Sequence, residues 1–154
     1  INDLNVIFIE RYIPRTSRTN DQMTQAGRSG KQNIVEGSLE RSLKMNIKLT
    51  GVARGSYGEL LEDYLDYLRQ HNLPIWDIRD PRVVELRSSH LTYKTNESYK
   101  SYLESPERHA NLMVVLLHKE NYLLDQLIRA QENKFVTEGG YSENLFKKRL
   151  ANRP

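Results

Sequence analysis

The sequence predicts an all-α protein, an up-and-down antiparallel four-helix bundle with a short C-terminal helix, in one domain of 154 residues. Residues 39–70 carry apolar side chains at helical spacing without a proline, enough for a helix of roughly 45 Å. The segments 1–13, 21–37 and 106–138 show the same periodicity. The connections between the first three segments are short, so successive helices are expected to pack antiparallel.

The longest predicted helix, residues 39–70, is the element that the others must cover. An amphipathic helix of this kind is not stable alone in water. Ser38 is predicted to cap its first turn, and His71 to close it. At about 100° per residue its apolar stripe contains the following residues: Leu39, Leu43, Ile47, Thr50, Ala53, Tyr57, Leu61, Tyr64, Leu65 and Leu68.

The boundaries of the first two helices follow from proline, capping residues and glycine. Pro14 ends the first helix, because proline cannot continue it. Thr19 or Asn20 is predicted to cap the second helix. Gly37 is predicted to stop it.

The second helix has a small contact face. Met23, Gly27, Gly30 and Ile34 share one stripe. Two glycines inside a helix cost about 1 kcal/mol each relative to alanine. Close approach of a neighbouring helix is the expected compensation.

The segment 71–105 is predicted to be a connector followed by a polar, tyrosine-rich surface excursion. Prolines in its first part forbid a continuous helix. Trp76, with Ile75 and Ile78, is predicted to pin the connector onto the bundle. A short helix is predicted over residues 82–90, opened by a proline at its first position.

The last long helix has clear end signals. Ser105 is a cap and Pro106 stands at the first helical position. Gly139 and Gly140 stop the helix, and a terminal helix is predicted over residues 142–153.

Glu120 falls in the middle of the apolar face of this last long helix. A buried carboxylate is costly unless it is paired or hydrogen-bonded, so Arg28 or Arg54 is the expected partner. The apolar residues of that face are Ala110, Leu112, Met113, Leu116, Leu117, Leu123, Leu124, Leu127, Ile128 and Phe135.

Composition indicates a cytoplasmic protein without a membrane partner. Cysteine is absent, which excludes disulfides and thiolate chemistry. The longest apolar run, residues 112–117, is far too short to span a bilayer. No signal peptide is visible. The chain begins at Ile1 inside a predicted helix, so we expect further residues before it.

Signals for catalysis are poor, and the sequence predicts a non-enzymatic protein without cofactor or metal. The four histidines are scattered and none forms Glu-x-x-His or His-Glu-x-x-His. They are expected to be surface or capping residues. No catalytic residue is predicted.

Basic residues are the remaining signal. Residues 11–58 carry nine Lys and Arg against three acidic residues, whereas residues 59–104 carry six against nine. A cationic surface can follow phosphates, and the alternative is a solvated helix face. Base-stacking aromatics are not interleaved with it, which argues against sequence-specific reading of single strands. The candidate nucleic-acid-binding residues are Arg15, Arg18, Arg28, Lys31, Arg41, Lys44 and Lys48.

Three glycines of the longest helix gather on its outer side. Gly51, Gly55 and Gly58 fall within about 60° of one another, just beyond the apolar stripe. We predict that they contact another chain of an oligomer. The alternative is that glycine is tolerated at a solvated surface.

Two blocks of sequence resemble a known family. The element Asn33-Ile34-Val35-Glu36-Gly37, within residues 18–38, and the stretch 48–60 resemble the four-helix bundle proteins related to those encoded in intervening sequences of bacterial large-subunit ribosomal RNA. Residues 121–125 and 138–141 are similar to the subgroup called the four helix bundle suffix domain.

The resemblance implies a four-helix bundle and, from related proteins, a ring-shaped homopentamer. One relative binds nucleic acid and a reverse transcriptase through basic surface residues. The sequence therefore favours an oligomeric, non-enzymatic protein that binds RNA, a nucleoprotein complex or a reverse-transcriptase-like protein. The alternative is a protein-interaction scaffold with no nucleic-acid role.

Overall fold

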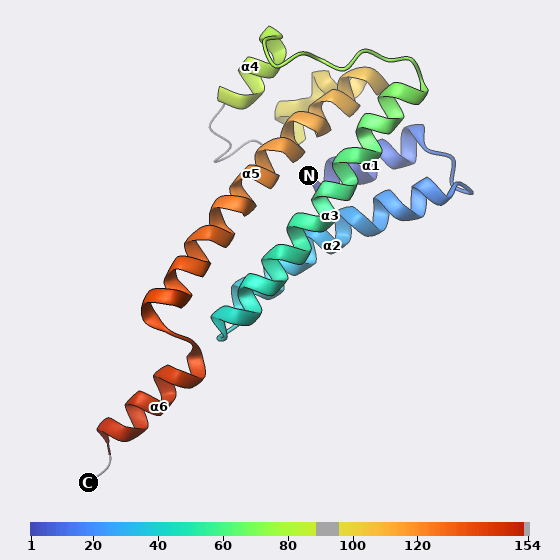
Figure 1. Cartoon of the computed structure of the whole chain (residues 1–154). Coiled ribbons are helices and arrows are strands. Elements are labelled where there is room, and N and C mark those ends of the chain that lie inside the picture. Colours follow the sequence, from blue (N-terminus) through green and yellow to red (C-terminus); the bar gives the residue numbers. More distant parts are fainter. Residues whose placement is uncertain (89–95, 153–154) are drawn as a thin grey trace.

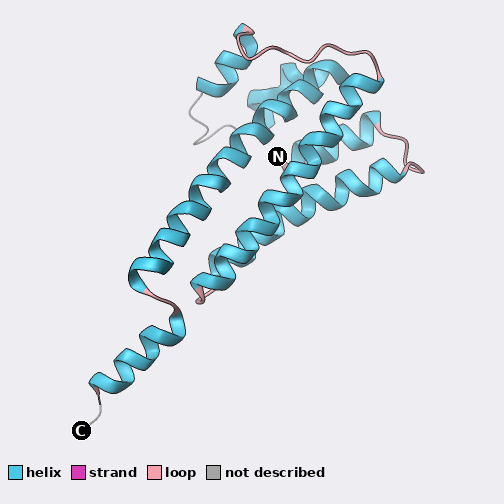
Figure 2. Ribbon diagram, viewed as in Figure 1, coloured by secondary structure: helices cyan, strands magenta, loops and turns pink. Residues whose placement is uncertain are grey.

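The computed structural model describes residues 1–88 and 96–152 (Figure 1). Every regular element in these ranges is helical and no strand occurs among them, so the predicted all-α class is confirmed (Figure 2). The elements are α1 (Asn2–Tyr12), α2 (Arg18–Leu39), α3 (Leu43–Gln70), α4 (Pro81–Ser88), the 3₁₀ helix η2 (Asn96–Glu104), α5 (Pro106–Glu138) and α6 (Tyr141–Ala151).

Helix α3 lies at the centre of the structure. It packs against α2 and α5, and both of these also contact α1. Figure 1 shows α2 and α3 running in opposite directions, with α5 running opposite to α3. Helix α1 has 11 residues and is about 16 Å long, whereas α3 has 28 residues and is about 42 Å long. Helix α1 can therefore lie beside only part of the length of α3. Helix α6 continues beyond α5, away from the other helices.

The predicted start of α3 was wrong. Its N-cap is Ser42, whose hydroxyl accepts the N–H of Met45 at 3.5 Å. The Ser38 hydroxyl instead donates to the Val35 carbonyl at 2.7 Å, inside α2. Leu39 is 78% exposed and does not belong to the buried stripe. Several serines precede the stripe, and periodicity alone does not select the one that caps.

The predicted cap of α2 was also wrong. Ser17 is the N-cap residue, so α2 begins before Thr19. The Asn20 side chain donates to the Ile13 carbonyl at 3.4 Å and ties α2 back to the end of α1. The side chain is therefore used across the turn rather than at the first helical turn.

The small face of α2 admits its neighbours at close range, as predicted. A Cβ on Gly30 would lie 2.6 Å from Cζ of Tyr57 in α3. A Cβ on Gly27 would lie 2.6 Å from Nδ2 of Asn5 in α1. Gly37 does not end α2, because the helix continues to residue 39 and Gly37 is buried against α3. Glycine here serves packing rather than termination.

The centre of the α3 stripe forms the core. Ala53, Tyr57, Leu61, Tyr64 and Leu68 are all buried. The residues at the start of the stripe, Leu43 and Ile47, are only half-buried. Both α2 and α5 reach this end of α3, at Asn46, whereas α1 contacts α3 further along, at Tyr64, so burial concentrates toward the level of α1.

The ends of α5 lie where the sequence predicts. The Ser105 hydroxyl accepts the N–H of Arg108 at 3.2 Å, Pro106 opens the helix and Gly139 closes it with φ of 79°. The predicted terminal helix is present as α6, which has no buried residue.

The predicted apolar face of α5 is only partly buried. Leu112, Leu117 and Leu124 are buried, but Leu123 is 49% and Leu127 44% exposed. Periodicity places these residues on a face, whereas burial also requires a neighbour at the same level. The described residues leave about half of each of those two side chains exposed.

Glu120 on α5 does not pair with either predicted arginine. It is half-buried, and burial raises its pKa. Arg54 instead donates to Asp125 at 2.9 Å, one turn further along α5, and Arg28 is exposed on α2. Glu120 also acts on Tyr57, whose pKa is raised to about 12 by burial and then by this carboxylate.

A buried polar chain joins α1, α2 and α3. The Asn5 amide donates to the Met23 carbonyl at 2.9 Å, and the Tyr64 hydroxyl donates to Asn5 Oδ1 at 2.8 Å. Buried polar groups are costly without partners, so these bonds fix the position of α1 along α2 and α3.

The prediction that histidines lie at the surface or in caps was wrong for His109. It is fully buried in α5, and its Nε2–H donates to the Leu4 carbonyl at 3.0 Å. Its ring packs edge-on against Phe8. Burial lowers the pKa of His109 to about 4, so the ring is neutral. His71 is the C-cap of α3, as predicted, and His90 lies outside the described residues.

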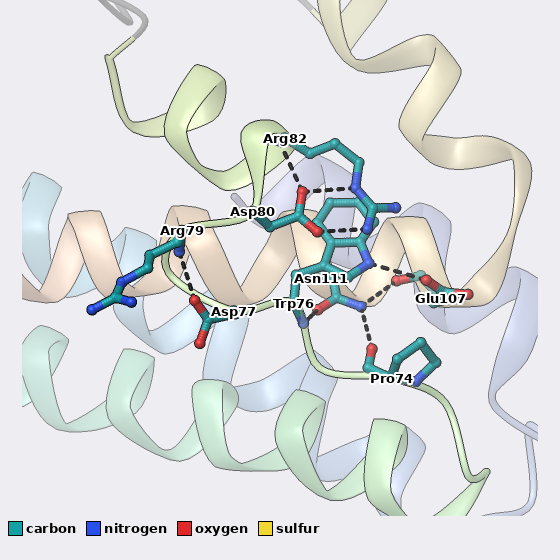
Figure 3. A network of polar contacts seen from close by, with 8 residues as sticks. All are labelled: Pro74, Trp76, Asp77, Arg79, Asp80, Arg82, Glu107 and Asn111. Atoms are coloured by element: carbon teal, nitrogen blue, oxygen red, sulfur yellow. Dashed lines mark hydrogen bonds and ion pairs between the residues drawn. The ribbon is translucent and has the colours of Figure 1, made fainter.

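The connector is held by Trp76, as predicted (Figure 3). The Trp76 N–H donates to Asn111 Oδ1 at 2.8 Å, and its indole N–H donates to Glu107 at 3.0 Å. The Arg82 guanidinium stacks 3.7 Å from the ring centroid. Ile75 and Ile78 do not join this anchor, because they are 52% and 61% exposed.

The segment after the connector matches its prediction in part. Helix α4 has Pro81 at its start, and Asp80 accepts the Arg82 N–H at 2.9 Å. The last two residues of the predicted helix 82–90 lie outside the described residues. In η2, Tyr99 and Leu103 are buried, so this stretch is more than a surface excursion.

We expect Gly30→Ala to lower the free energy of unfolding by about 1–3 kcal/mol, because the methyl group overlaps the Tyr57 ring. Gly51→Ala is the matched control. No atom lies within 4 Å of a Cβ there, so the better helix propensity should stabilise by about 0.5–1 kcal/mol. Urea unfolding measures both variants. Equal effects would contradict the close approach of α2 and α3.

We expect acid to destabilise the fold through His109. Its pKa is about 4 in the folded chain against 6.5 unfolded, so the unfolded state binds the proton first. Stability is complete above pH 6.5 and falls towards pH 4, by about 2 kcal/mol at pH 5. His109→Gln, which keeps a donor for Leu4, should lack this component when urea unfolding is compared at pH 7.5 and 5. The same pH loss in both proteins would refute the assignment.

Candidate nucleic-acid interface

The seven predicted basic residues all have exposed side chains. Arg15 lies in the turn between α1 and α2, and Arg18 is the first residue of α2. Four of the others lie on α2 or in the first turns of α3, and Arg41 lies in the turn between these helices. They are Arg28, Lys31, Lys44 and Lys48.

The structure does not bring all seven together. Helix α2 has 22 residues, about 33 Å, and separates Arg18 at its start from Arg41 beyond its end. Arg41, Lys44 and Lys48 lie at the end of the assembly formed by the α2–α3 turn, and we call them the turn cluster. Arg28 lies between the two ends, on α2.

The turn cluster carries charges that are not neutralised. Within residues 1–88 and 99–152, none of the seven basic side chains forms a salt bridge. Arg54, Arg69 and Arg82, in contrast, each pair with an aspartate at 2.9 Å or less. Unpaired surface cations can neutralise phosphates, and the counterions that the nucleic acid then releases drive binding.

Helix α3 is electrically polarised along its length. Its first turns carry Lys44 and Lys48, and its second half carries Glu59, Asp63 and Asp66 among other acidic residues. Burial raises the pKa of Asp63 to about 6, and the charges of Asp66 and Glu59 add to this. Such mutual repulsion marks an excess of negative potential, which confines any phosphate contact to the other end of α3.

A polar hollow of about 490 Å³ lies between α2 and α3 in this acidic region. Gln22 and Gln25 line it from α2, and Glu59, Glu62 and Asp63 line it from α3. Its carboxylates make it unsuited to a phosphate.

The predicted oligomer contact lies on an open part of α3. No heavy atom lies within 4 Å of a Cβ built on Gly51 or Gly55, and both residues are exposed. Gly58 is half-buried, with the Arg54 guanidinium 3.3 Å from its Cβ position. A second chain can reach this face without displacing another part of the described structure. The contact itself stays a prediction.

Among the described residues, no cluster of three or more His, Asp or Glu side chains is placed to hold a metal ion. Over the same part of the chain, no helix has both the length and the apolar content needed to cross a bilayer.

Comparisons of the chain with protein-family models, with curated proteins and with solved structures found no match. The family resemblance therefore rests on the residues of the sequence alone.

The residues that carry the resemblance have a structural task in this chain. Gly30 and Gly37 of the first block face α3, and Tyr57 of the second block fills the space beside Gly30. The Asn33 amide donates to the Ser29 carbonyl of its own helix at 2.9 Å. Both blocks thus belong to the packing of α2 on α3. Arg41 and Lys44 of the turn cluster lie between the two blocks, and Lys48 is the first residue of the second block.

Besides the polar hollow between α2 and α3, sequence reasoning missed an apolar hollow, which lies beside Trp76. Residues from α3, the connector, α4 and α5 line it, including Leu65, Val83 and Val115. The only sequence signal was the presence of Trp76 between two isoleucines, and that pattern predicted a buried anchor instead of an open hollow.

Proposed function

We propose that this chain is a non-enzymatic, cytoplasmic, oligomeric protein that binds RNA or a nucleoprotein complex through its basic surface. In this proposal α1, α2, α3 and α5 form an up-and-down four-helix bundle. The observation that carries it is the turn cluster, Arg41, Lys44 and Lys48, exposed and without ion pairs among the described residues.

Oligomerisation supplies the positive electrostatic potential that a single chain lacks. The net charge of a single chain is only +3, too small for strong association with a polyanion. In a ring, such as the homopentamer implied by the family resemblance, each subunit adds a turn cluster. Several weak contacts on one RNA then act together and raise the overall affinity.

A scaffold without a nucleic-acid role is the second candidate, and α6 favours it. This helix exposes Tyr141, Leu145, Phe146 and Leu150, and it buries no residue in the chain. Exposed apolar side chains in such number are typical of protein-interaction surfaces. A reverse-transcriptase-like protein is one partner class that fits either candidate.

The double variant Lys44→Glu/Lys48→Glu is expected to weaken binding of structured RNA by at least about tenfold and to reduce the salt slope by roughly two. Filter binding between about 50 and 200 mM salt measures both quantities. Arg79→Glu/Arg129→Glu makes the same charge change at exposed positions outside the basic surface and should bind almost as the parent does.

Absence of RNA binding by the parent at low salt would end the nucleic-acid proposal, and so would equal losses in the two double variants. If Lys44→Glu/Lys48→Glu kept every protein partner of the parent, the scaffold would be favoured.

Gly55→Glu is expected to break the oligomer, because a charged side chain then stands on the proposed contact face. The isolated subunit should still fold, since no atom lies within 4 Å of the added Cβ. Sedimentation velocity should show a smaller species for Gly55→Glu and the parental species for Gln126→Glu, an exposed control on α5. Parental sedimentation of both variants would place the interface elsewhere.

A further inference from the structure

The hollow beside Trp76 is an apolar cavity of about 540 Å³. Its floor is formed by Val83 of α4 and Val114 and Val115 of α5, all of which are buried. Ile78 and Tyr122 lie at its mouth with exposed side chains. The volume lies within the range of roughly 300–1,000 Å³ typical of small-molecule sites.

One wall of the cavity is rigid before any ligand arrives. Trp76 is fixed by its N–H bond to Asn111, its indole bond to Glu107 and the stacked Arg82 (Figure 3). Asn111 also donates to the Pro74 carbonyl at 2.9 Å, which holds the connector on α5. A preformed wall reduces the conformational entropy lost on binding.

The charges on the cavity lining have one sign. Among the described residues, Arg87 and Lys119 are the formally charged side chains of the lining, and no carboxylate belongs to it. The Lys119 ammonium donates to the Arg87 carbonyl at 3.3 Å, which brings the end of α4 next to this part of α5. The nearby Asp80 is bound to Arg82 at 2.7 Å and is not among the lining residues.

We propose that this cavity binds a single-chain anionic amphiphile, namely a free fatty carboxylate of medium length. The hydrocarbon chain lies on the valine floor and is removed from water, which supplies most of the binding energy. The carboxylate lies at the edge marked by Arg87, where the guanidinium offers paired N–H donors. Charge complementarity selects an anionic head group over a neutral or cationic one.

Trp76 provides a direct readout, because it is the only tryptophan of the chain and lines the cavity. Titration of the full chain with dodecanoate below its micelle concentration should give a saturable change in tryptophan fluorescence. Dodecyltrimethylammonium should bind at least about tenfold more weakly, since its head group meets only cations.

Two variants separate the head-group and chain contacts. Arg87→Gln should weaken dodecanoate binding at least about fivefold, and Ile78→Ser should weaken it by loss of apolar contact. Both residues are exposed, so folding should be preserved. Arg129→Gln removes an exposed charge from α5 outside the cavity and should leave the affinity unchanged.

Several results would overturn the proposal. These are no saturable response to dodecanoate, equal affinities of Arg87→Gln and Arg129→Gln, and equal binding of the cationic amphiphile. A fluorescence change that depends on protein concentration without ligand would assign the cavity to a second copy of the chain. A response to phosphatidylglycerol vesicles alone would assign it to a membrane surface.

Discussion

The close approach of α2 to α3 is the contact on which the rest of the structure depends. The Tyr57 ring occupies the space in which any other residue at position 30 would place its Cβ. This contact lets the longest stripe of the chain face two helices at once, because α5 takes the remaining side of α3. The neighbouring bond between Tyr64 and Asn5 then sets the position of α1.

Most helices could be predicted from local chemistry, because their signals lie within a few residues of each boundary. Ser105, Pro106 and Gly139 fixed α5 in this way. Whether a side chain is buried depends on which other elements pack against it, and sequence periodicity carries no information about those neighbours. The sequence therefore predicted His109 at the surface, because its hydrogen-bond partner, the Leu4 carbonyl, is far away in the sequence.

The candidate interface was predictable in its composition but not in its arrangement. Lysine and arginine at polar helix positions are almost always exposed, and all seven are. Whether a basic side chain forms an ion pair with an aspartate of another helix depends on how each helix is rotated about its axis. The pairing of Arg54 with Asp125 could therefore not be predicted. The cavity beside Trp76 was hidden for a similar reason, because an irregular connector has no period that fixes the direction of Ile75 and Ile78.

The polarity of α3 links its stability to what surrounds the turn cluster. Lys44 lies in the first turn, where unsatisfied backbone N–H groups already give the helix a positive end. A like charge at that position costs about 0.3–1 kcal/mol. An anion bound there interacts favourably with both Lys44 and the positive end of the helix. The charges that destabilise the free helix then stabilise the helix with its anion bound. A polyanion bound at this end of α3 should therefore raise the melting temperature of the protein, because it removes an unfavourable interaction of the free helix.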